Sequence, residues 1–256
     1  MRSFRVVPAV VALLLLPGAA AAAAGTDPSG QPLPKIPIEQ KGSPFQAGFR
    51  LSIEEGGRVE SSAGAVFVRH DGILCVSVDA PIHQRLAFGR QQLTIYYPDE
   101  KTVLVAKPGP GKLPVMIDAL LLAFIDPSGL LTKNATVLSQ TEDPAAHTLT
   151  TIWVVSDPSG KNQARMKLVE ARDGTRSIEV LSKEGVLLNR YEFDGRVALG
   201  TAHIPTRITV TYKRTGKPDR VDRWTLDRVA AENDGSGAAQ SCVAVPAGLH
   251  AREITL

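Results

Sequence analysis

The chain has 256 residues, of which 43% are hydrophobic and only 5% aromatic, and its formal net charge is +3. Two of the positive charges, Arg2 and Arg5, belong to an N-terminal segment that we expect to be removed, which takes the net charge from +3 to +1. A near-neutral balance with both signs interspersed argues against nucleic acid as the main partner.

The N-terminal segment has the layout of a secretory signal. Arg2 and Arg5 precede an apolar run over residues 6–24 that ends in a tract of alanine. A basic start, an apolar middle and small residues at the cleavage point are typical of export. We therefore expect cleavage near Ala24 and an exported, periplasmic protein. A retained membrane anchor is the alternative, but Pro17 interrupts the run and the alanine tract is only weakly apolar.

The remaining chain divides into three parts. Residues 25–44 contain five prolines and predict an extended linker, because proline lacks an amide donor and disfavours helix before it. Residues 45–229 show short apolar runs separated by turn signals and are interpreted as one β domain. Residues 230–256 are interpreted as a flexible spacer and a C-terminal tail.

The first predicted strand, over residues 45–55, has one apolar face. Phe45, Ala47, Phe49, Leu51 and Ile53 alternate with mostly polar residues, and successive side chains on a strand point to opposite faces. Similar runs follow along most of the domain. An antiparallel sheet with one apolar face must cover that face, either with other elements or with an apolar ligand.

The alternation of apolar and polar residues stops at residues 113–125, LPVMIDALLLAFI, where Asp118 is the only charged residue. The density of leucine, methionine and alanine favours a helix. Because apolar residues surround this helix on all sides, we expect it to be buried on more than one face. It is too short to span a membrane.

No pattern in the chain predicts an enzyme, a metal site or a cofactor. The five histidines are scattered, no G-x-S-x-G motif occurs, and the loop at Gly109-Pro110-Gly111-Lys112 lacks the spacing of a phosphate-binding loop. Two cysteines occur, Cys75 and Cys242. Export permits a disulfide between them, which would attach the tail to the sheet; two unlinked thiols are the alternative.

The hypothesis that the protein binds a ligand rests on its apolar residues. Each of them fits an ordinary core, but together they also fit a partly filled cavity between a curved sheet and the helix. Such cavities suit lipid carriers, because burying an acyl chain gains about 0.8 kcal/mol per CH₂ group. The candidate ligand-binding residues are Phe49, Leu51, Phe67, Arg69, Val76, Leu86, Ile95 and Trp153 on or next to predicted strands, and Met116, Leu120 and Phe124 on the predicted helix.

Several segments resemble the LolA/LolB-like superfamily of periplasmic lipoprotein carriers. Phe45 and Phe49 match its first strand, Phe67-Val68-Arg69-His70 its second, Pro81 the loop that follows, and residues 89–98 its next strand–turn–strand unit. Residues 187–210 resemble the closing half of its sheet. Arg90 replaces the glycine of the family's Asp-Gly turn, and the prolines of residues 25–44 forbid the family's helix before the first strand.

This resemblance implies a mainly β fold, an incomplete and strongly curved antiparallel β-barrel with a short covering helix. It implies a monomer that binds acyl chains of lipoproteins or lipids and exchanges them with hand-over proteins at the inner and outer membranes. The family's functional basic residue would fall at Arg69 or His70. The alternative function is a periplasmic envelope sensor or protein-interaction module on the same scaffold, without a transported ligand.

Overall fold

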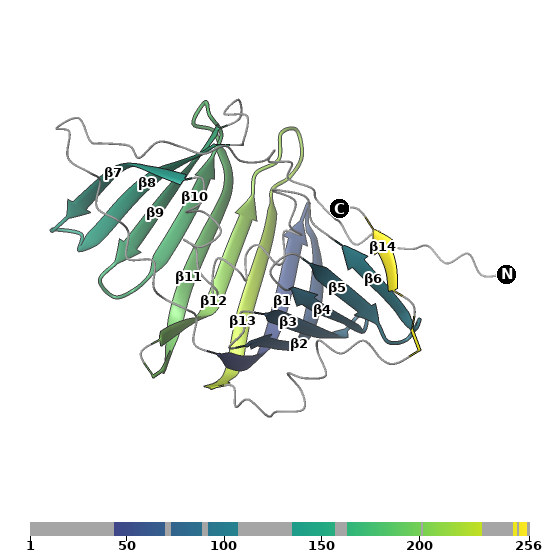
Figure 1. Cartoon of the computed structure of the whole chain (residues 1–256). Helices are drawn as coiled ribbons and strands as arrows, with labels where there is room; N and C mark the ends of the chain where they lie inside the picture. Colours follow the sequence, from purple (N-terminus) through teal and green to yellow (C-terminus); the bar gives the residue numbers. More distant parts are fainter. Residues whose placement is uncertain are drawn as a thin grey trace.

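The computed structural model describes residues 44–69, 73–88, 92–106, 135–156, 163–200, 202–231, 248–249 and 251–254, and the secondary structure in these ranges is a single β-sheet (Figure 1). The strands are β1 (Phe45–Glu55), β2 (Arg58–Val68), β3 (Leu74–Ala80), β4 (Gln84–Phe88), β5 (Leu93–Tyr97), β6 (Thr102–Ala106), β7 (Ala135–Asp143), β8 (Thr148–Ser156), β9 (Gln163–Ala171), β10 (Arg176–Leu181), β11 (Leu187–Leu199), β12 (Ala202–Tyr212), β13 (Arg220–Ala231) and β14 (Ala251–Ile254).

The sheet consists of two runs of sequential antiparallel strands joined side by side. The spatial order is β14-β6-β5-β4-β3-β2-β1-β13-β12-β11-β10-β9-β8-β7. The first strand, β1, pairs with β13, and the last, β14, pairs with β6 in parallel. The described sheet is not closed, since β7 and β14 are its outermost strands. The predicted open antiparallel β fold is therefore confirmed, whereas the predicted helix over residues 113–125 lies outside the described residues.

The alternation predicted for β1 sets one face of the sheet, which we call the core face. Phe45, Phe49 and Leu51 are buried on it, while Arg50 between them is exposed. The neighbouring strand β13 continues this face, because Trp224 lies opposite Leu51 and Leu226 opposite Phe49 in the register. Cross-strand pairs of this kind are the unit of sheet stabilisation. The other side of the sheet is called the opposite face below.

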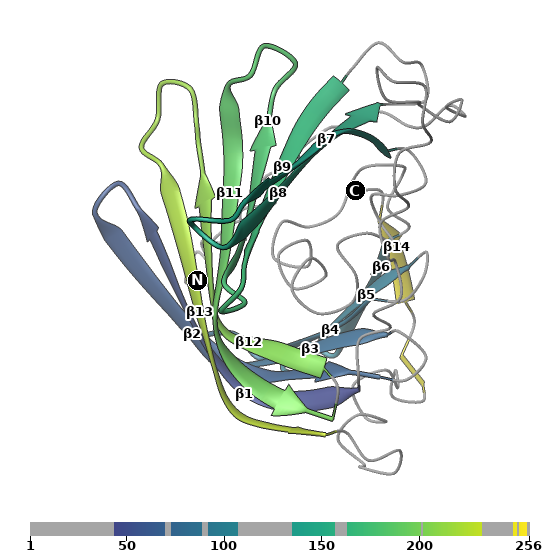
Figure 2. The ribbon, with the colours of Figure 1, turned by 90° about the vertical axis from the view of Figure 1, so that its left-hand side faces the viewer.

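The sheet curves, and its β7–β10 end and β4–β6 end turn toward the same side (Figure 2). Irregular positions lie along the bend. The register of β1 and β13 shifts by a bulge where Arg228 takes a φ of 51°. Gly195 in β11 has a φ of 61°, a conformation that glycine adopts without strain. Bulges bend strands and increase their twist, which accounts for curvature at these positions.

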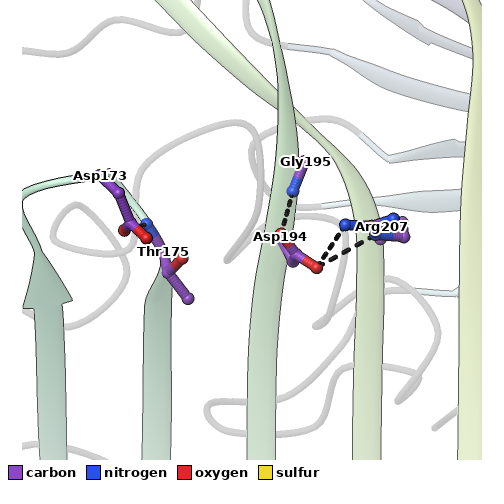
Figure 3. A network of polar contacts seen from close by, with 5 residues as sticks. All are labelled: Asp173, Thr175, Asp194, Gly195 and Arg207. Atoms are coloured by element: carbon purple, nitrogen blue, oxygen red, sulfur yellow. Dashed lines mark hydrogen bonds and ion pairs between the residues drawn. The ribbon is translucent and has the colours of Figure 1, made fainter.

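Charged residues cover much of the opposite face. Asp194 on β11 accepts hydrogen bonds from the Arg207 guanidinium on β12 at 2.6 and 3.1 Å and from the amide of Gly195 (Figure 3). Figure 3 also shows the turn before β10, where the Thr175 amide donates to Asp173 at 2.8 Å. This part of the opposite face therefore carries polar and charged side chains that are suited to contact with solvent.

The C-terminal residues contain structure that the sequence did not predict. Residues 230–256 were expected to be a spacer and tail, but β13 extends to Ala231 and residues 251–254 form β14 at the edge of the sheet. Alternation over four residues is too short a signal to distinguish a strand from a loop.

No helix in the described part of the chain combines the length and the apolar composition that crossing a membrane requires.

Candidate functional site

The core face carries one connected cluster of buried apolar residues. It extends across the sheet from Ala106 on β6 to Trp153 on β8, and includes residues of both runs of strands. Because β1 and β13 join these runs, the cluster brings together Phe49 and Trp224, which come from opposite ends of the domain. A single apolar surface of this extent is the principal candidate for a functional site.

The centre of this surface is aromatic. The ring centroids of Phe49 and Trp224 are 5.1 Å apart, with the ring planes tilted by 49°. The guanidinium carbon of Arg176 on β10 lies 4.6 Å from the ring centre of Phe193 on β11. Tilted aromatic pairs and cation–π contacts each hold ring orientations by about 0.5–1.5 kcal/mol, so these rings form a fixed rather than a loose surface.

The structure brings together six of the residues that the sequence singled out for ligand binding. Five belong to the core-face cluster and the sixth, Ile95, packs against it; the five are Phe49, Leu51, Val76, Leu86 and Trp153. These residues come from β1, β3, β4, β5 and β8. Met116, Leu120 and Phe124 lie outside the described residues.

Phe67 is placed differently from the other candidates. It belongs to a second, smaller cluster with Cys75 and Ala87, on the opposite face of β2, β3 and β4. The sequence did not reveal this, because Val66, Phe67 and Val68 are all buried and the alternation gives no sign of the face. Phe67 is thus separated by the sheet from the apolar surface around Phe49.

Arg69 and Cys75 lie at the same end of the sheet. Arg69 directly follows β2, and its amide donates to the carbonyl of Ile73 at 3.0 Å in the connection to β3. Cys75 is fully buried on β3 and is disulfide-bonded. The sequence contains one other cysteine, Cys242, which lies outside the described residues.

A polar group that the sequence did not reveal lies at the other end of the core face. Asn189, Tyr212 and Arg220 are cross-strand partners on β11, β12 and β13. Asp222, whose side chain is 2% exposed, accepts two hydrogen bonds from Arg220, at 2.7 Å from Nε and 2.8 Å from Nη2. The guanidinium carbon lies 5.6 Å from the ring centre of Tyr212. We call Asn189, Tyr212, Arg220 and Asp222 the polar row.

The electrostatics of the polar row depend on Asp222. Burial alone would lower the pKa of Arg220, but the hydrogen bonds and charge of Asp222 outweigh it, so that the pKa of the guanidinium is raised. Beside this pair, Arg214 binds Glu55 at 2.5 Å, and Glu55 is the cross-strand partner of Arg220. The sequence contained a signal for one member of this site, Asp222, which is in phase with Trp224 and Leu226 on the apolar side of β13.

Among the described residues, no group of three or more histidine, cysteine, aspartate or glutamate side chains is arranged to hold a metal ion. His83, one of the scattered histidines, lies 3.3 Å from Asp99, but both side chains are exposed.

The fold was compared with those of known proteins. No family model matches the sequence, and no curated protein matches it. Among solved structures, a DUF1329 family protein from Desulfovibrio piger is 13% identical with a TM-score of 0.54, over 78% of this chain and 90% of that one. A LolA superfamily protein from Nitrosomonas europaea is 13% identical with a TM-score of 0.50, over 78% and 91% of the two chains.

A domain described as a putative outer membrane lipoprotein-sorting protein, from Vibrio parahaemolyticus, is 10% identical with a TM-score of 0.51, over 78% of this chain and 89% of that one. At such low identity these likenesses show the fold alone. The protein therefore has a LolA-like fold, as the resemblance noted in the sequence implied.

Proposed function

We propose that the protein is an exported carrier that binds the acyl chains of lipoproteins or lipids on its core face and moves them through the periplasm. The observation that carries this proposal is the single apolar cluster that spans an open, curved sheet from β6 to β8. The LolA-like fold supports it, as does the secretory signal predicted for residues 1–24.

The energetics of such a function need no covalent chemistry. An acyl chain of 16 carbons would gain roughly 10 kcal/mol from burial, at about 0.8 kcal/mol per CH₂ group, before the cost of ordering the chain is subtracted. Fixed aromatic rings such as Phe49 and Trp224 would bind the chain without losing much side-chain entropy. The protein is therefore proposed as a carrier and not an enzyme.

Native mass spectrometry of the mature protein, purified from an exporting host without detergent, tests this function. We expect a mass addition that tandem fragmentation resolves into an acyl lipid or a lipidated peptide. Leu51→Asp, which places a charge at the centre of the core face, should abolish the addition; Arg50→Asp on the opposite face is the matched control and should retain it.

The contrary result would be a folded protein without acyl adducts that also fails to bind added lipid. Recovery of one defined protein partner by that lipid-free form would support the envelope sensor or interaction module instead. In that case the core face would serve only as the hydrophobic core of the scaffold.

A further inference from the structure

A second apolar cluster lies on the opposite face, away from the surface that is proposed to bind acyl chains. Phe67, Cys75 and Ala87 are direct cross-strand partners on β2, β3 and β4. Their side chains are buried, with exposed fractions of 8%, 0% and 7%, and Ala65 and Ile73 pack against them. We call these five residues the opposite-face patch.

The opposite-face patch is buried although the described strands provide no second layer above it. These strands form one sheet, and Ala65 and Ile73 each lie two positions from a buried member of the patch, on the same side of the same strand or of the residues leading into it. Farther along this face, Arg50 on β1 and Thr225 on β13 are exposed. A phenylalanine on an uncovered sheet face would stay in contact with water, so chain from outside the described strands must cover the patch.

A disulfide identifies the covering segment. Cys75 lies between its two partners at the centre of the patch and is disulfide-bonded, and Cys242 is the only other cysteine in the sequence. The Cα atoms of bonded cysteines are about 5.5 Å apart, so the backbone around residue 242 must lie directly against the sheet at β3. Because the side chain of Cys75 belongs to the opposite face, this backbone lies on that face.

The lengths of chain on either side of Cys242 fit this placement. β13 ends at Ala231, and β14 begins at Ala251 on the far side of β1–β6 (Figure 1). β3 is three strands from β13 and four from β14, which at about 4.8 Å per strand gives about 14 Å and about 19 Å. Cys242 comes eleven residues after Ala231 and nine before Ala251. Extended chains of these lengths reach about 36 Å and about 30 Å, so both parts span their distances with slack.

The composition of the chain from Cys242 onward suits a flat apolar surface. Residues 242–247 read CVAVPA and carry no charge, whereas residues 232–237, ENDGSG, are mostly polar. Alanine and proline lose no side-chain freedom on burial, and β-branched valine is restricted beforehand, so such a segment packs at a low entropic cost. The patch offers it small and aliphatic side chains and the single ring of Phe67.

We propose that residues 242–247 dock on the opposite-face patch, and that the disulfide between Cys75 and Cys242 holds them there and so keeps β14 attached to the edge of the sheet at β6. The occupant of this second apolar surface is a segment of the chain itself, and the patch is therefore not available to a lipid or a partner protein. This inference does not depend on the carrier function.

Disulfide trapping tests the docking in a Cys75→Ala/Cys242→Ala chain, so that a new bond replaces the native one. Residues 243–245 are changed to cysteine one at a time, each together with either Ala87→Cys or Leu86→Cys. Ala87 and Leu86 are consecutive on β4 and equally buried, at 7%, but lie on opposite faces. Peptide mapping without reduction should find at least about tenfold more cross-link to residue 87 than to residue 86 for at least one of the three positions.

The role of the disulfide is tested with anilinonaphthalene sulfonate, a dye whose fluorescence rises on exposed apolar surface. Well below its thermal midpoint, Cys75→Ala/Cys242→Ala should raise the dye fluorescence about twofold or more over the wild type, because the patch is uncovered. Ser241→Ala, which leaves the bond intact, is the matched control and should not. Adding Phe67→Ser to the double variant should remove the rise, which distinguishes the patch from the core face. Far-UV circular dichroism verifies that each variant retains its sheet.

The outcomes decide each part of the proposal. Cross-linking to neither residue 87 nor residue 86, or to both equally, would overturn the docking. Unchanged dye fluorescence in the double cysteine variant would overturn the role of the disulfide, and so would a rise that Phe67→Ser leaves in place.

Discussion

Phe49 and Trp224 lie on neighbouring strands from opposite ends of the domain, with their ring centroids 5.1 Å apart on the core face. The chain has only two tryptophans, and the other, Trp153, is buried in the same cluster. Intrinsic fluorescence therefore reports directly on the surface that is proposed to bind acyl chains.

We expect acyl lipids brominated along the chain to quench this fluorescence saturably, because bromine must approach the indole ring closely to quench it. In the Trp153→Phe variant, which retains Trp224 alone, quenching should persist. Non-brominated lipid of the same chain length is the control and should compete. Quenching that rises linearly with lipid, without saturation, would indicate collisional contact with solvent-exposed rings and contradict a bound chain.

The Arg220–Asp222 pair should behave as a buried ion pair. Asp222→Leu leaves the guanidinium without its charge partner and should lower the free energy of unfolding by about 3–5 kcal/mol. The double variant Arg220→Met/Asp222→Leu removes both charges and should recover most of that loss. Urea titrations of the three proteins measure the difference. Equal destabilisation by the single and double variants would show that an unpaired Arg220 carries no cost, contrary to this prediction.

Gly64 should resist substitution because of space rather than backbone conformation. A Cβ atom there would overlap the backbone oxygen of Ser77 on β3, so Gly64→Ala forces two strands apart and should cost about 3 kcal/mol or more. Gly57→Ala is the control, because Gly57 has a φ of 81° but no atom lies within 4 Å of the position that a Cβ would take, and it should cost only about 1 kcal/mol. Chemical denaturation of both variants measures the two losses. Similar values would contradict a steric cause at Gly64.

The disulfide of Cys75 is predicted to join it to Cys242. Peptide mapping without reduction should recover one cross-linked peptide that contains both residues. Since Cys75 is fully buried in β3, reduction or the Cys75→Ala/Cys242→Ala variant should lower the free energy of unfolding by about 2–4 kcal/mol. A cross-link between two copies of Cys75, or a wild-type protein in which Cys242 reacts with iodoacetamide under native oxidising conditions, would refute this pairing.

Acid should destabilise the opposite face through Asp194. The backbone N–H of Gly195, followed by the Arg207 guanidinium, lowers the pKa of this carboxyl group. A depressed native pKa stabilises the fold above the unfolded value, which is about 4, and this contribution is lost as the pH falls through the lower native value. Asp194→Asn should therefore reduce the loss of stability between about pH 5 and about pH 2. Denaturant titrations at several pH values measure this loss. If the free energy of unfolding of the variant fell with acid as steeply as that of the wild type, this role of Asp194 would be ruled out.

The sequence was sufficient to predict the strands that alternate cleanly. In β1, one apolar residue at every second position predicted both the strand and its buried face, and Phe49 and Leu51 lie there as expected. The turn at Gly56-Gly57 was likewise visible, because both residues take positive φ values that glycine tolerates. Local periodicity was enough for these elements because their burial is one-sided.

Other features depended on partners that lie far away in the sequence. Phe67 is buried on the face away from Phe49, and only the packing of β2 against β3 and β4 decides this. The polar row was missed because Asn189, Tyr212 and Arg220 belong to three strands, and only their register places them side by side. The pairing of β14 with β6 is of the same kind, since a parallel partner leaves no turn signal between the two strands.

The order of the strands has a consequence for how the molecule is assembled. Apart from the contacts of β1 with β13 and of β14 with β6, every ladder in the described sheet joins strands that follow one another in the chain. The β1–β13 ladder can form only after the chain has been synthesised beyond residue 220, because β13 begins there. Until then β1 is an unpaired edge with an apolar face, and such edges are where nascent chains associate wrongly. Formation of the junction between the two runs of strands is thus also the step before which a newly synthesised chain is most exposed to aggregation.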